Sequence, residues 1–350
     1  MTGTETTETT ETTEPGGTAE AADEAGEALL DVRDLRVTYR QAGYEVPAVR
    51  GVSFRLGRGE TLGVAGESGS GKSTMALSLL RLAGDSAEVG GEVRFAGEDL
   101  LTARWVRLRA VRWAGASVIF QGAMSALNPV QTVLEQIVEP ILLHEKVGPR
   151  EAERRAARLL ESVGIPARRM RAHPHEFSGG QRQRVMIAMA LACGPDLVIA
   201  DEPTTALDVM VQAQILGLLA DLVRESRVAV IMISHDLAVL AHACERLAVM
   251  YAGRFVEVGP SRQVIEDPRH PYTRALAQAF PTIGDPASRL APAGLPGDPP
   301  RPSQLGEGCS FAPRCAVVMD SCRSREMELW GVGPERAAAC LRVLPGEGAE

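Results

Sequence analysis

Residues 66–73 have the types and spacing needed to hold phosphate groups. They read Gly-Glu-Ser-Gly-Ser-Gly-Lys-Ser and fit the pattern G-x-x-x-x-G-K-[ST] in full. The glycines let backbone N–H groups curl around phosphate oxygens, and the helix that follows adds the positive end of its dipole. Lys72 would supply charge to the β- and γ-phosphates, and the Ser73 hydroxyl can ligate Mg²⁺. The predicted binding residues of this phosphate loop are Gly66, Glu67, Ser68, Gly69, Ser70, Gly71, Lys72, Ser73 and Thr74.

Two adjacent carboxylates follow the apolar segment 197–200. Asp201 can hold Mg²⁺, directly or through water, and Glu202 can polarise an attacking water as a general base. An acidic pair at the end of a strand is ordinary by itself. Because a phosphate loop precedes it in the chain, the pair predicts hydrolysis of the bound phosphate.

A second glycine turn opens a helix further along the chain. It reads Phe177-Ser178-Gly179-Gly180-Gln181 and leads into the helical run 185–192. Backbone N–H groups and a hydroxyl at the start of a helix form another anion site. Two such sites in one chain are redundant unless two chains pair head to tail, so that each turn faces the other chain's phosphate loop.

The pattern of apolar residues predicts the elements that position these groups. Strands are expected at 29–39, 49–56, 61–65, 197–200 and 228–233, and helices at 73–82, 151–163 and through most of 130–195. Strands separated by helices imply an α/β fold with a mainly parallel, covered sheet. The helical block then lies as an insertion between two strands of that sheet.

Charge is spread unevenly along the 350 residues. The formal net charge is −8, and residues 1–28 contain eight acidic side chains and no basic ones. We expect this Thr-Glu and Gly-Ala segment to be a disordered tail. The near-neutral remainder lacks the basic stripe of a general nucleic-acid binder. No run approaches the ~20 apolar residues that span a bilayer, and no signal peptide is visible, so we expect a cytosolic protein.

The order of these motifs resembles that of the ATP-binding-cassette (ABC) ATPases, over about residues 29–345. The resemblance implies a P-loop fold with a RecA-like core, an antiparallel β subdomain and a helical subdomain at about 122–195. The ATPase domain would span 29–267, and an irregular, cysteine-containing extension would span 268–350. It also implies a Mg-dependent ATPase that binds ATP between two cassettes and drives transport.

The resemblance further implies roles for single residues. Tyr39 would stack on adenine, although a tyrosine on the surface at a strand end would occupy the same position. Gln121 would touch Mg²⁺ or the attacking water, and His235 would reach the γ-phosphate. Ser178, Gly179, Gly180 and Gln181 would contact the partner's nucleotide, and Asp208 would link the two sites across the dimer. Phe177 stands where leucine is the commonest first residue of this signature.

Three segments resemble the dipeptide/oligopeptide importer branch: 59–63, 120–129 and 270–276. Nickel importers share them, so nickel or another small solute stays an alternative. A soluble ABC ATPase acting on ribosomes or DNA is disfavoured by the single signature. The branch implies a homologous second cassette, as a heterodimer, two membrane-spanning permease subunits and an extracytoplasmic solute-binding protein. The chain would sit at the cytoplasmic face of the membrane, without nucleic acid as a partner. A homodimer remains open.

Four of the six cysteines lie in the extension: Cys309, Cys315, Cys322 and Cys340. This loop-rich region has too little apolar content for its own core, and a metal or covalent staple would explain its stability. In this branch the four resemble ligands of a [4Fe–4S] cluster. A four-thiolate zinc site and four unliganded thiols remain alternatives, and redox sensing would be an added property. Cys193 and Cys244 are expected to be core thiols.

Overall fold

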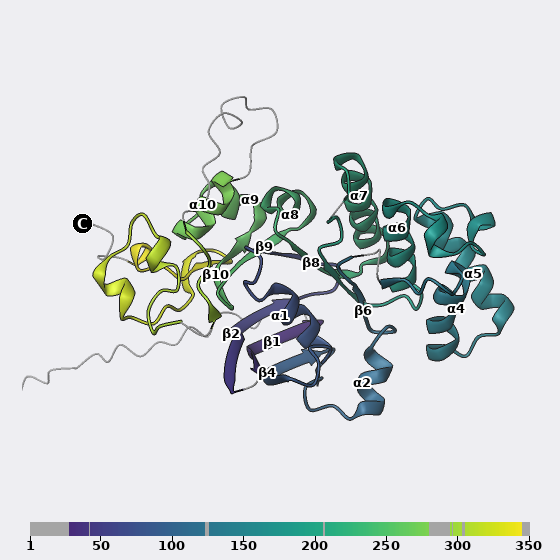
Figure 1. The fold of residues 1–350 in the computed structure, drawn as a ribbon, viewed down its shortest axis with the longest axis horizontal. Coiled ribbons are helices and arrows are strands. Elements are labelled where there is room, and N and C mark those ends of the chain that lie inside the picture. The colour runs from purple at the N-terminus through teal and green to yellow at the C-terminus, as the bar shows by residue number, and fades with distance from the viewer. Residues whose placement is uncertain are drawn as a thin grey trace, which may run out of the picture.

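The computed structural model describes residues 28–41, 43–122, 126–205, 207–279, 295, 297–302 and 305–344. Residues 1–27 of the expected acidic tail and most of the proline-rich stretch 281–302 lie outside the described residues. Two sheets with helices around them form the frame of the molecule (Figure 1). No helix among the described residues is both long and apolar enough to cross a membrane.

The larger sheet has eight strands in the order β11-β12-β10-β9-β3-β8-β7-β6. The strands from β9 to the β6 edge are parallel, namely β3 (Thr61–Ala65), β6 (Ala116–Ile119), β7 (Leu197–Asp201), β8 (Ala229–Ser234) and β9 (Arg246–Tyr251). Every residue of β3, β7 and β8 is buried, because helices cover both faces of a parallel sheet. The strands expected at 61–65, 197–200 and 228–233 are therefore confirmed.

The smaller sheet is antiparallel, with the order β2-β1-β4-β5. It consists of β1 (Leu30–Gln41), β2 (Tyr44–Leu56), β4 (Ala87–Phe95) and β5 (Glu98–Asp99). Its apolar side chains share one core with those of β3 and with helix α1 (Lys72–Leu79). Helix α2 (Trp105–Val111) lies next to it (Figure 1). The shared core holds the antiparallel subdomain against the phosphate loop.

A helical block lies at the β6 end of the larger sheet (Figure 1). It contains α4 (Val133–His144), α5 (Pro149–Ser162), the short 3₁₀ helices η1 (Ala167–Arg169) and η2 (Pro174–Glu176), and α6 (Gly179–Ala190). Helix α5 buries Ala152, Ala156 and Leu160 on one side, which is the spacing of an amphipathic helix. The expected helical insertion is confirmed. Two further helices follow it, α7 (Val209–Ser226) and α8 (Leu237–Ala243).

The C-terminal extension has more regular structure than the sequence led us to expect. After β10 (Arg254–Pro260) and α9 (Ser261–Glu266), the described residues form helix α10 (Pro271–Ala279), the 3₁₀ helices η4 (Ala312–Arg314), η5 (Asp320–Arg323) and η6 (Leu341–Val343), and the strands β11 (Trp330–Gly333) and β12 (Arg336–Ala338). Strand β12 pairs with β10, so the extension continues the larger sheet. A sheet edge offers unpaired N–H and C=O groups, and even a short strand can use them.

A buried ion pair fixes this junction. Arg336 of β12 lies 2.9 Å from the carboxylate of Glu257 in β10, whose side chain is fully buried. The same carboxylate accepts backbone N–H groups from Arg269 and His270. A buried charge needs such partners, because an unpaired one would be strongly destabilising. The extension is thus anchored to the larger sheet by both backbone and side-chain contacts.

Candidate ATP site

The phosphate loop joins β3 to α1 at the carboxyl end of the parallel strands. Gly71, with a φ of 104°, is the N-cap of α1, and no side chain at this position caps the helix. A Cβ on Gly71 would lie 2.3 Å from the carbonyl oxygen of Ala48, and a Cβ on Gly66 would lie 2.2 Å from that of Met250. Only glycine fits so close to other backbone. The backbone at Ala48 and Met250 therefore packs against one side of the loop, and the N–H groups at the start of α1 are left to bind an anion.

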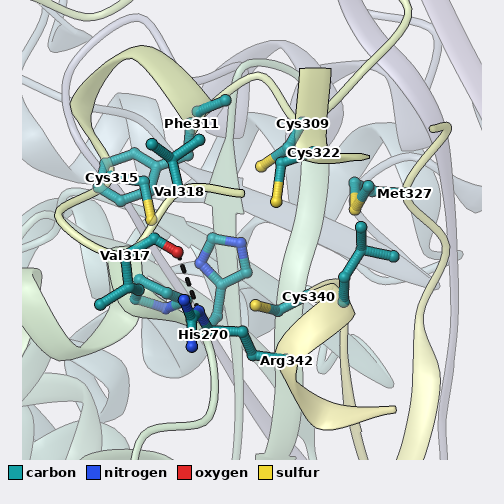
Figure 2. A pocket seen from close by; sticks show the side chains of 13 residues that line it. His270, Cys309, Phe311, Cys315, Val317, Val318, Cys322, Met327, Cys340 and Arg342 are labelled. Carbon is teal, nitrogen blue, oxygen red and sulfur yellow. Dashed lines mark hydrogen bonds between the residues drawn. The ribbon is translucent and has the colours of Figure 1, made fainter. Parts of the chain in front are cut away.

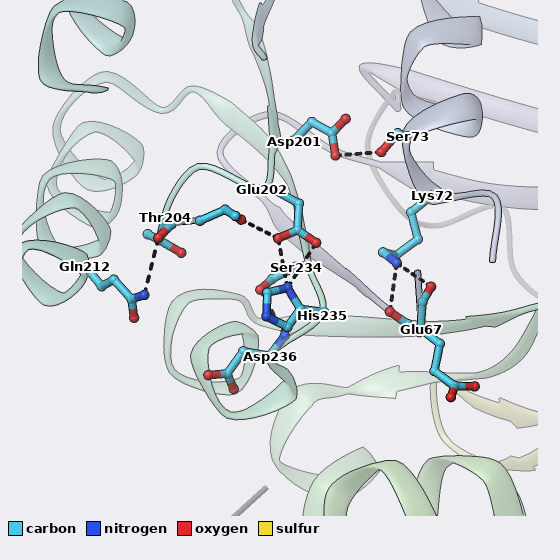
Figure 3. Close-up of polar contacts among 12 residues, drawn as sticks. Glu67, Lys72, Ser73, Asp201, Glu202, Thr204, Gln212, Ser234, His235 and Asp236 are labelled. Atoms are coloured by element: carbon cyan, nitrogen blue, oxygen red, sulfur yellow. Dashed lines mark hydrogen bonds and ion pairs between the residues drawn. The ribbon is translucent and has the colours of Figure 1, made fainter. Parts of the chain in front are cut away.

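Lys72 lies inside the loop and is only 6% exposed. Its Nζ donates to the carbonyl oxygens of Gly66 and Glu67, at 2.7 and 2.8 Å (Figure 3). Burial lowers the pKa of Lys72, and the nearby carboxylates of Glu202 and Asp201 oppose that shift. The loop itself thus holds the ammonium group at its centre.

Asp201 ends β7 and is 5% exposed. The Ser73 hydroxyl donates to Asp201 Oδ1 at 3.0 Å (Figure 3). Burial raises the pKa of Asp201, and this hydrogen bond acts in the opposite direction. A hydroxyl and a carboxylate in contact are the hard oxygen ligands that Mg²⁺ prefers, so these residues fit a magnesium ion.

Glu202 adopts a left-handed backbone conformation, with a φ of 49°. Such a conformation in a residue other than glycine is strained and is common at functional sites. His235 Nδ1 lies 2.9 Å from Glu202 Oε2 (Figure 3). Thr205 Oγ1 donates to the same oxygen at 2.6 Å. His235 follows β8, so the ends of two neighbouring strands bring the pair together. Sequence reasoning missed Thr205, although a hydroxyl three residues after the glutamate was a usable signal.

One pocket collects most of the predicted ATP-site residues. Its lining is Tyr39, Val46, Ala48, Ser68, Gly69, Gly71, Lys72, Ser73, Thr74, Gln121, Glu202, Thr205, His235 and Pro302. Tyr39 Oη donates to Thr74 Oγ1 at 3.4 Å, which places the tyrosine beside the start of α1. Of the residues predicted in the phosphate loop and the acidic pair, Gly66, Glu67, Ser70 and Asp201 do not line this pocket, although Asp201 contacts Ser73, which does. Val46, Ala48 and Pro302 were not predicted.

The signature turn lies elsewhere on the chain. Ser178 caps α6, with its Oγ accepting from Gln181 N at 3.3 Å, while Gln181 Oε1 accepts from Ser178 N at 3.1 Å. The Arg169 guanidinium lies 4.1 Å from the ring centroid of buried Phe177, so the phenylalanine has a packing role. Ser178, Gly179, Gly180 and Gln181 are absent from the lining of the pocket that contains Lys72.

The start of α7 lies against the signature turn. A Cβ on Gly180 would lie 2.6 Å from Val211 Cγ1, so the two helix starts approach closely. Asp208 caps α7 by accepting from Val211 N at 3.0 Å, and it does not line the pocket either. Ala206, two residues before Asp208 in the sequence, lies outside the described residues. The predicted trans contacts therefore form a second group of residues, separate from the phosphate loop.

The four cysteines of the extension line one cavity together with His270 and other side chains (Figure 2). Burial raises the pKa of Cys309 to about 11, and it also raises the pKa of Cys315 and Cys340. Among the described residues, no group of three or more His, Cys, Asp or Glu side chains is placed to hold a metal ion. The thiols thus share a cavity but do not form a ligand set as they are placed.

The two remaining cysteines are core thiols, as expected. Cys193 and Cys244 are buried, and burial raises the pKa of Cys193 to about 11 and that of Cys244 to about 12. A thiol with a raised pKa in apolar surroundings is unreactive. Neither residue lines the cavity of the other four.

Comparison with known proteins agrees with this geometry. Residues 49–205 match the ABC transporter family, and residues 256–322 match the C-terminal region of oligopeptide/dipeptide transporters. The chain is 45% identical over 318 residues to the oligopeptide transport ATP-binding protein OppD of Salmonella typhimurium, covering 90% of this chain and 94% of that protein. It is 46% identical over 320 residues to OppD of Escherichia coli, covering 91% and 94%.

A solved structure is similar over about two thirds of the chain. The ATP-binding cassette MJ0796, a dimer in a post-hydrolysis state with ADP and Pi, superposes with a TM-score of 0.61 at 29% identity, covering 67% of this chain and 99% of that chain. Together with the phosphate loop, the acidic pair and the signature turn, these matches place the protein. The chain belongs to the ATP-binding subunits of the oligopeptide/dipeptide family of ABC transporters.

Proposed function

We propose that this chain is the motor subunit of a peptide importer, which binds and hydrolyses Mg-ATP to drive uptake across the cytoplasmic membrane. One observation carries the proposal: the buried lysine, the Ser73–Asp201 contact and the Glu202–His235 pair converge on one pocket beyond the parallel strands. Each of these groups suits a different task in phosphoryl transfer. Their convergence supports ATP hydrolysis over mere nucleotide binding.

Each residue of the pocket has a chemical task in this proposal. The loop amides and Lys72 hold the β- and γ-phosphates, and Tyr39 stacks on adenine. Ser73, Asp201 and Gln121 would hold Mg²⁺, and a bound magnesium ion would neutralise charge on the phosphate oxygens. Glu202 accepts a proton from the attacking water as a general base. His235 and Thr205 fix the orientation of the Glu202 carboxylate through their contacts with Oε2.

The working unit in this proposal is a head-to-tail pair of cassettes. The signature residues do not line the pocket of their own chain, and the similar cassette MJ0796 is a dimer. Ser178, Gly179, Gly180 and Gln181 then act on the nucleotide of the partner, with Asp208 between the two sites. We propose a homologous second cassette as that partner, with two permease subunits and an extracytoplasmic solute-binding protein, at the cytoplasmic face of the membrane.

Glu202→Gln tests the motor function. The amide cannot take the proton, so we expect ATPase activity to fall at least about 100-fold, while ATP binding is retained. The variant should accumulate as an ATP-bound dimer with its cassette partner on size-exclusion chromatography. Glu225→Gln, at the exposed end of α7, is the matched control and should behave as the wild type. Normal turnover by Glu202→Gln would refute the assignment.

The transported solute is tested separately. Capture of the membrane partners and the solute-binding protein with this chain, followed by a binding screen of that protein, should identify oligopeptides as ligands. The two OppD relatives are named as oligopeptide transport proteins, which supports this choice. Binding of Ni²⁺ without binding of any peptide would overturn the peptide assignment and leave the motor function in place.

We also propose, from the resemblance, that the four cysteines of the extension bind a [4Fe–4S] cluster. Their shared cavity supports this role, although the sulfur atoms would have to move to reach one cluster. Iron, sulfide and zinc analysis of anaerobically purified protein separates the three alternatives. Four iron and four sulfide per chain would support the cluster, zinc would replace it, and four free thiols by titration would refute both.

A further inference from the structure

The C-terminal extension reaches back to the phosphate loop of its own chain. Arg314 lies in η4, between Cys309 and Cys315, and its side chain is 6% exposed. Its Nη1 donates to Glu67 Oε2 at 2.6 Å, and its Nη2 donates to Glu67 Oε1 at 3.0 Å. This two-point pairing fixes both the position and the plane of the carboxylate. It joins residues that are 247 positions apart in the sequence.

A second contact holds the backbone of the same residue. Glu67 N donates to the hydroxyl of Tyr272 in α10 at 2.9 Å. Tyr272 is fully buried, and its ring centroid lies 4.5 Å from that of Tyr251 and 5.4 Å from that of Phe311. Tyr251 in turn accepts from Arg314 Nη1 at 3.3 Å. The side chain and the backbone of Glu67 are therefore held by one packed aromatic cluster.

Glu67 links this cluster to the ATP site. Its carbonyl oxygen accepts from Lys72 Nζ at 2.8 Å, on the side where phosphate would bind. Its carboxylate does not line the pocket, and Figure 3 shows it pointing away from Lys72 and His235. The carbonyl oxygen of Glu67 thus binds Lys72 inside the loop, while its N–H and its carboxylate bind Tyr272 and Arg314 of the extension.

We propose that Arg314 is a positioning residue of the ATP site. By fixing Glu67, it holds the phosphate loop in the shape that accepts ATP, and the extension thereby sets the ATP affinity of its own subunit. This inference rests on the proposed ATPase function and adds a residue outside the ATPase domain to it. Preorganised binding groups gain affinity because less motion has to be frozen when the ligand binds.

A double-mutant cycle tests the inference on the full chain. Arg314→Met and Glu67→Gln should each raise the Kd and the KM for ATP about five- to tenfold, with kcat within about twofold. Because the two residues act through one another, the double variant should be no weaker than the weaker single variant. Arg314→Lys should recover only part of the affinity, since an ammonium cannot pair with both carboxylate oxygens in the same plane.

Arg342→Met is the matched control. Arg342 lines the cysteine cavity, but its Nε donates to the backbone oxygen of Val317, and none of its described hydrogen bonds reaches the phosphate loop. It should leave the Kd for ATP unchanged. Melting temperatures report any general loss of folding, and if Arg314→Met does not fold, Glu67→Gln and Arg314→Lys carry the test.

Three results would overturn the inference. They are an unchanged Kd in the folded Arg314 and Glu67 variants, additive losses in the double variant, or an equal loss of affinity in Arg342→Met. The Kd is measured without hydrolysis, under conditions where the wild type binds ATP. Failure here would therefore leave the Glu202→Gln test of the motor function untouched.

Discussion

Two glycine turns of this chain begin a helix and present backbone N–H groups, but they are built differently. The phosphate loop before α1 lies in a pocket with a buried lysine, and the turn before α6 begins at an exposed serine. Ser178 and Gln181 also satisfy each other in a capping box, whereas Gly71 brings no side-chain cap. The difference agrees with our proposal that the first turn binds ATP within its own chain and that the second acts on the nucleotide of a partner chain.

The two turns also differ in what holds their shape. The phosphate loop depends on distant contacts: Ser70 O accepts from Gly253 N at 2.9 Å, and Glu67 is held by Arg314 and Tyr272. The hydrogen bonds of the signature turn come from nearby residues such as Arg169, which donates to Gln181 at 3.1 Å, and its more distant contact is the packing of Gly180 against Val211. We infer that remote changes affect the phosphate loop, while the signature turn responds mainly to local ones.

The largest effect is expected at the phosphate loop. Lys72→Ala removes the charge that meets the phosphates, and we expect ATPase activity to fall at least about 100-fold with weakened ATP binding. Steady-state phosphate release and ATP titration measure both. The chain has one other lysine, the exposed Lys146, so Lys146→Ala is a matched control with expected wild-type activity. Normal ATP turnover in Lys72→Ala would contradict the proposal that the phosphate loop, and not the signature turn, binds ATP within its own chain.

A change in the signature turn should lower ATPase activity without weakening ATP binding by the single chain, whereas Lys72→Ala should weaken both. Ser178→Arg places a bulky charge at the surface that faces the partner, so ATP-dependent pairing should be lost and activity should fall about 10- to 100-fold. The Kd of the single chain for ATP should stay within about twofold, since Ser178 does not line its pocket. Ser162→Arg, at the exposed last residue of α5, is the control. A matching loss of ATP binding by the monomer would contradict the two-surface interpretation.

The smallest expected effect is on the free energy of unfolding and comes from the buried carboxylate of Asp201 beside the phosphate loop. Burial raises the folded-state pKa of Asp201, so its ionised form destabilises the folded protein at neutral pH. Asp201→Asn should therefore raise the free energy of unfolding by about 1 kcal/mol at pH 7.5 without nucleotide or Mg²⁺. The gain should shrink as pH falls toward the unfolded pKa of about 3.9, because the wild-type carboxyl then becomes protonated.

Urea unfolding in EDTA at two pH values measures this difference. Asp208→Asn is the control on the signature side, because asparagine caps a helix about as well as aspartate and Asp208 is exposed. We expect it to change stability by less than about 0.5 kcal/mol. If the wild type is more stable than Asp201→Asn at pH 7.5, the prediction is wrong. The favourable contacts of the carboxylate with Ser73 and Lys72 would then exceed the free-energy cost of burying its charge.

The sequence alone determined the local parts of this protein. The strand, loop and helix around Lys72, the acidic pair after β7 and the helix cap at Ser178 each lie within one short segment, where spacing and residue type fix the geometry. The order of these segments also predicted the parallel sheet and the helical insertion.

Only the tertiary structure decided which distant segments meet. Apolar periodicity predicts which residues are buried but not which segments they pack against. It therefore could not show that β12 pairs with β10, that Pro302 and Thr205 line the ATP pocket, or that Arg314 forms an ion pair with Glu67. The phosphate-loop motif also assigned Glu67 to the nucleotide, whereas in the fold its carboxylate pairs with Arg314 of the extension. Such contacts depend on how the whole core packs, because a side chain's partner is set by the neighbours that burial brings to it.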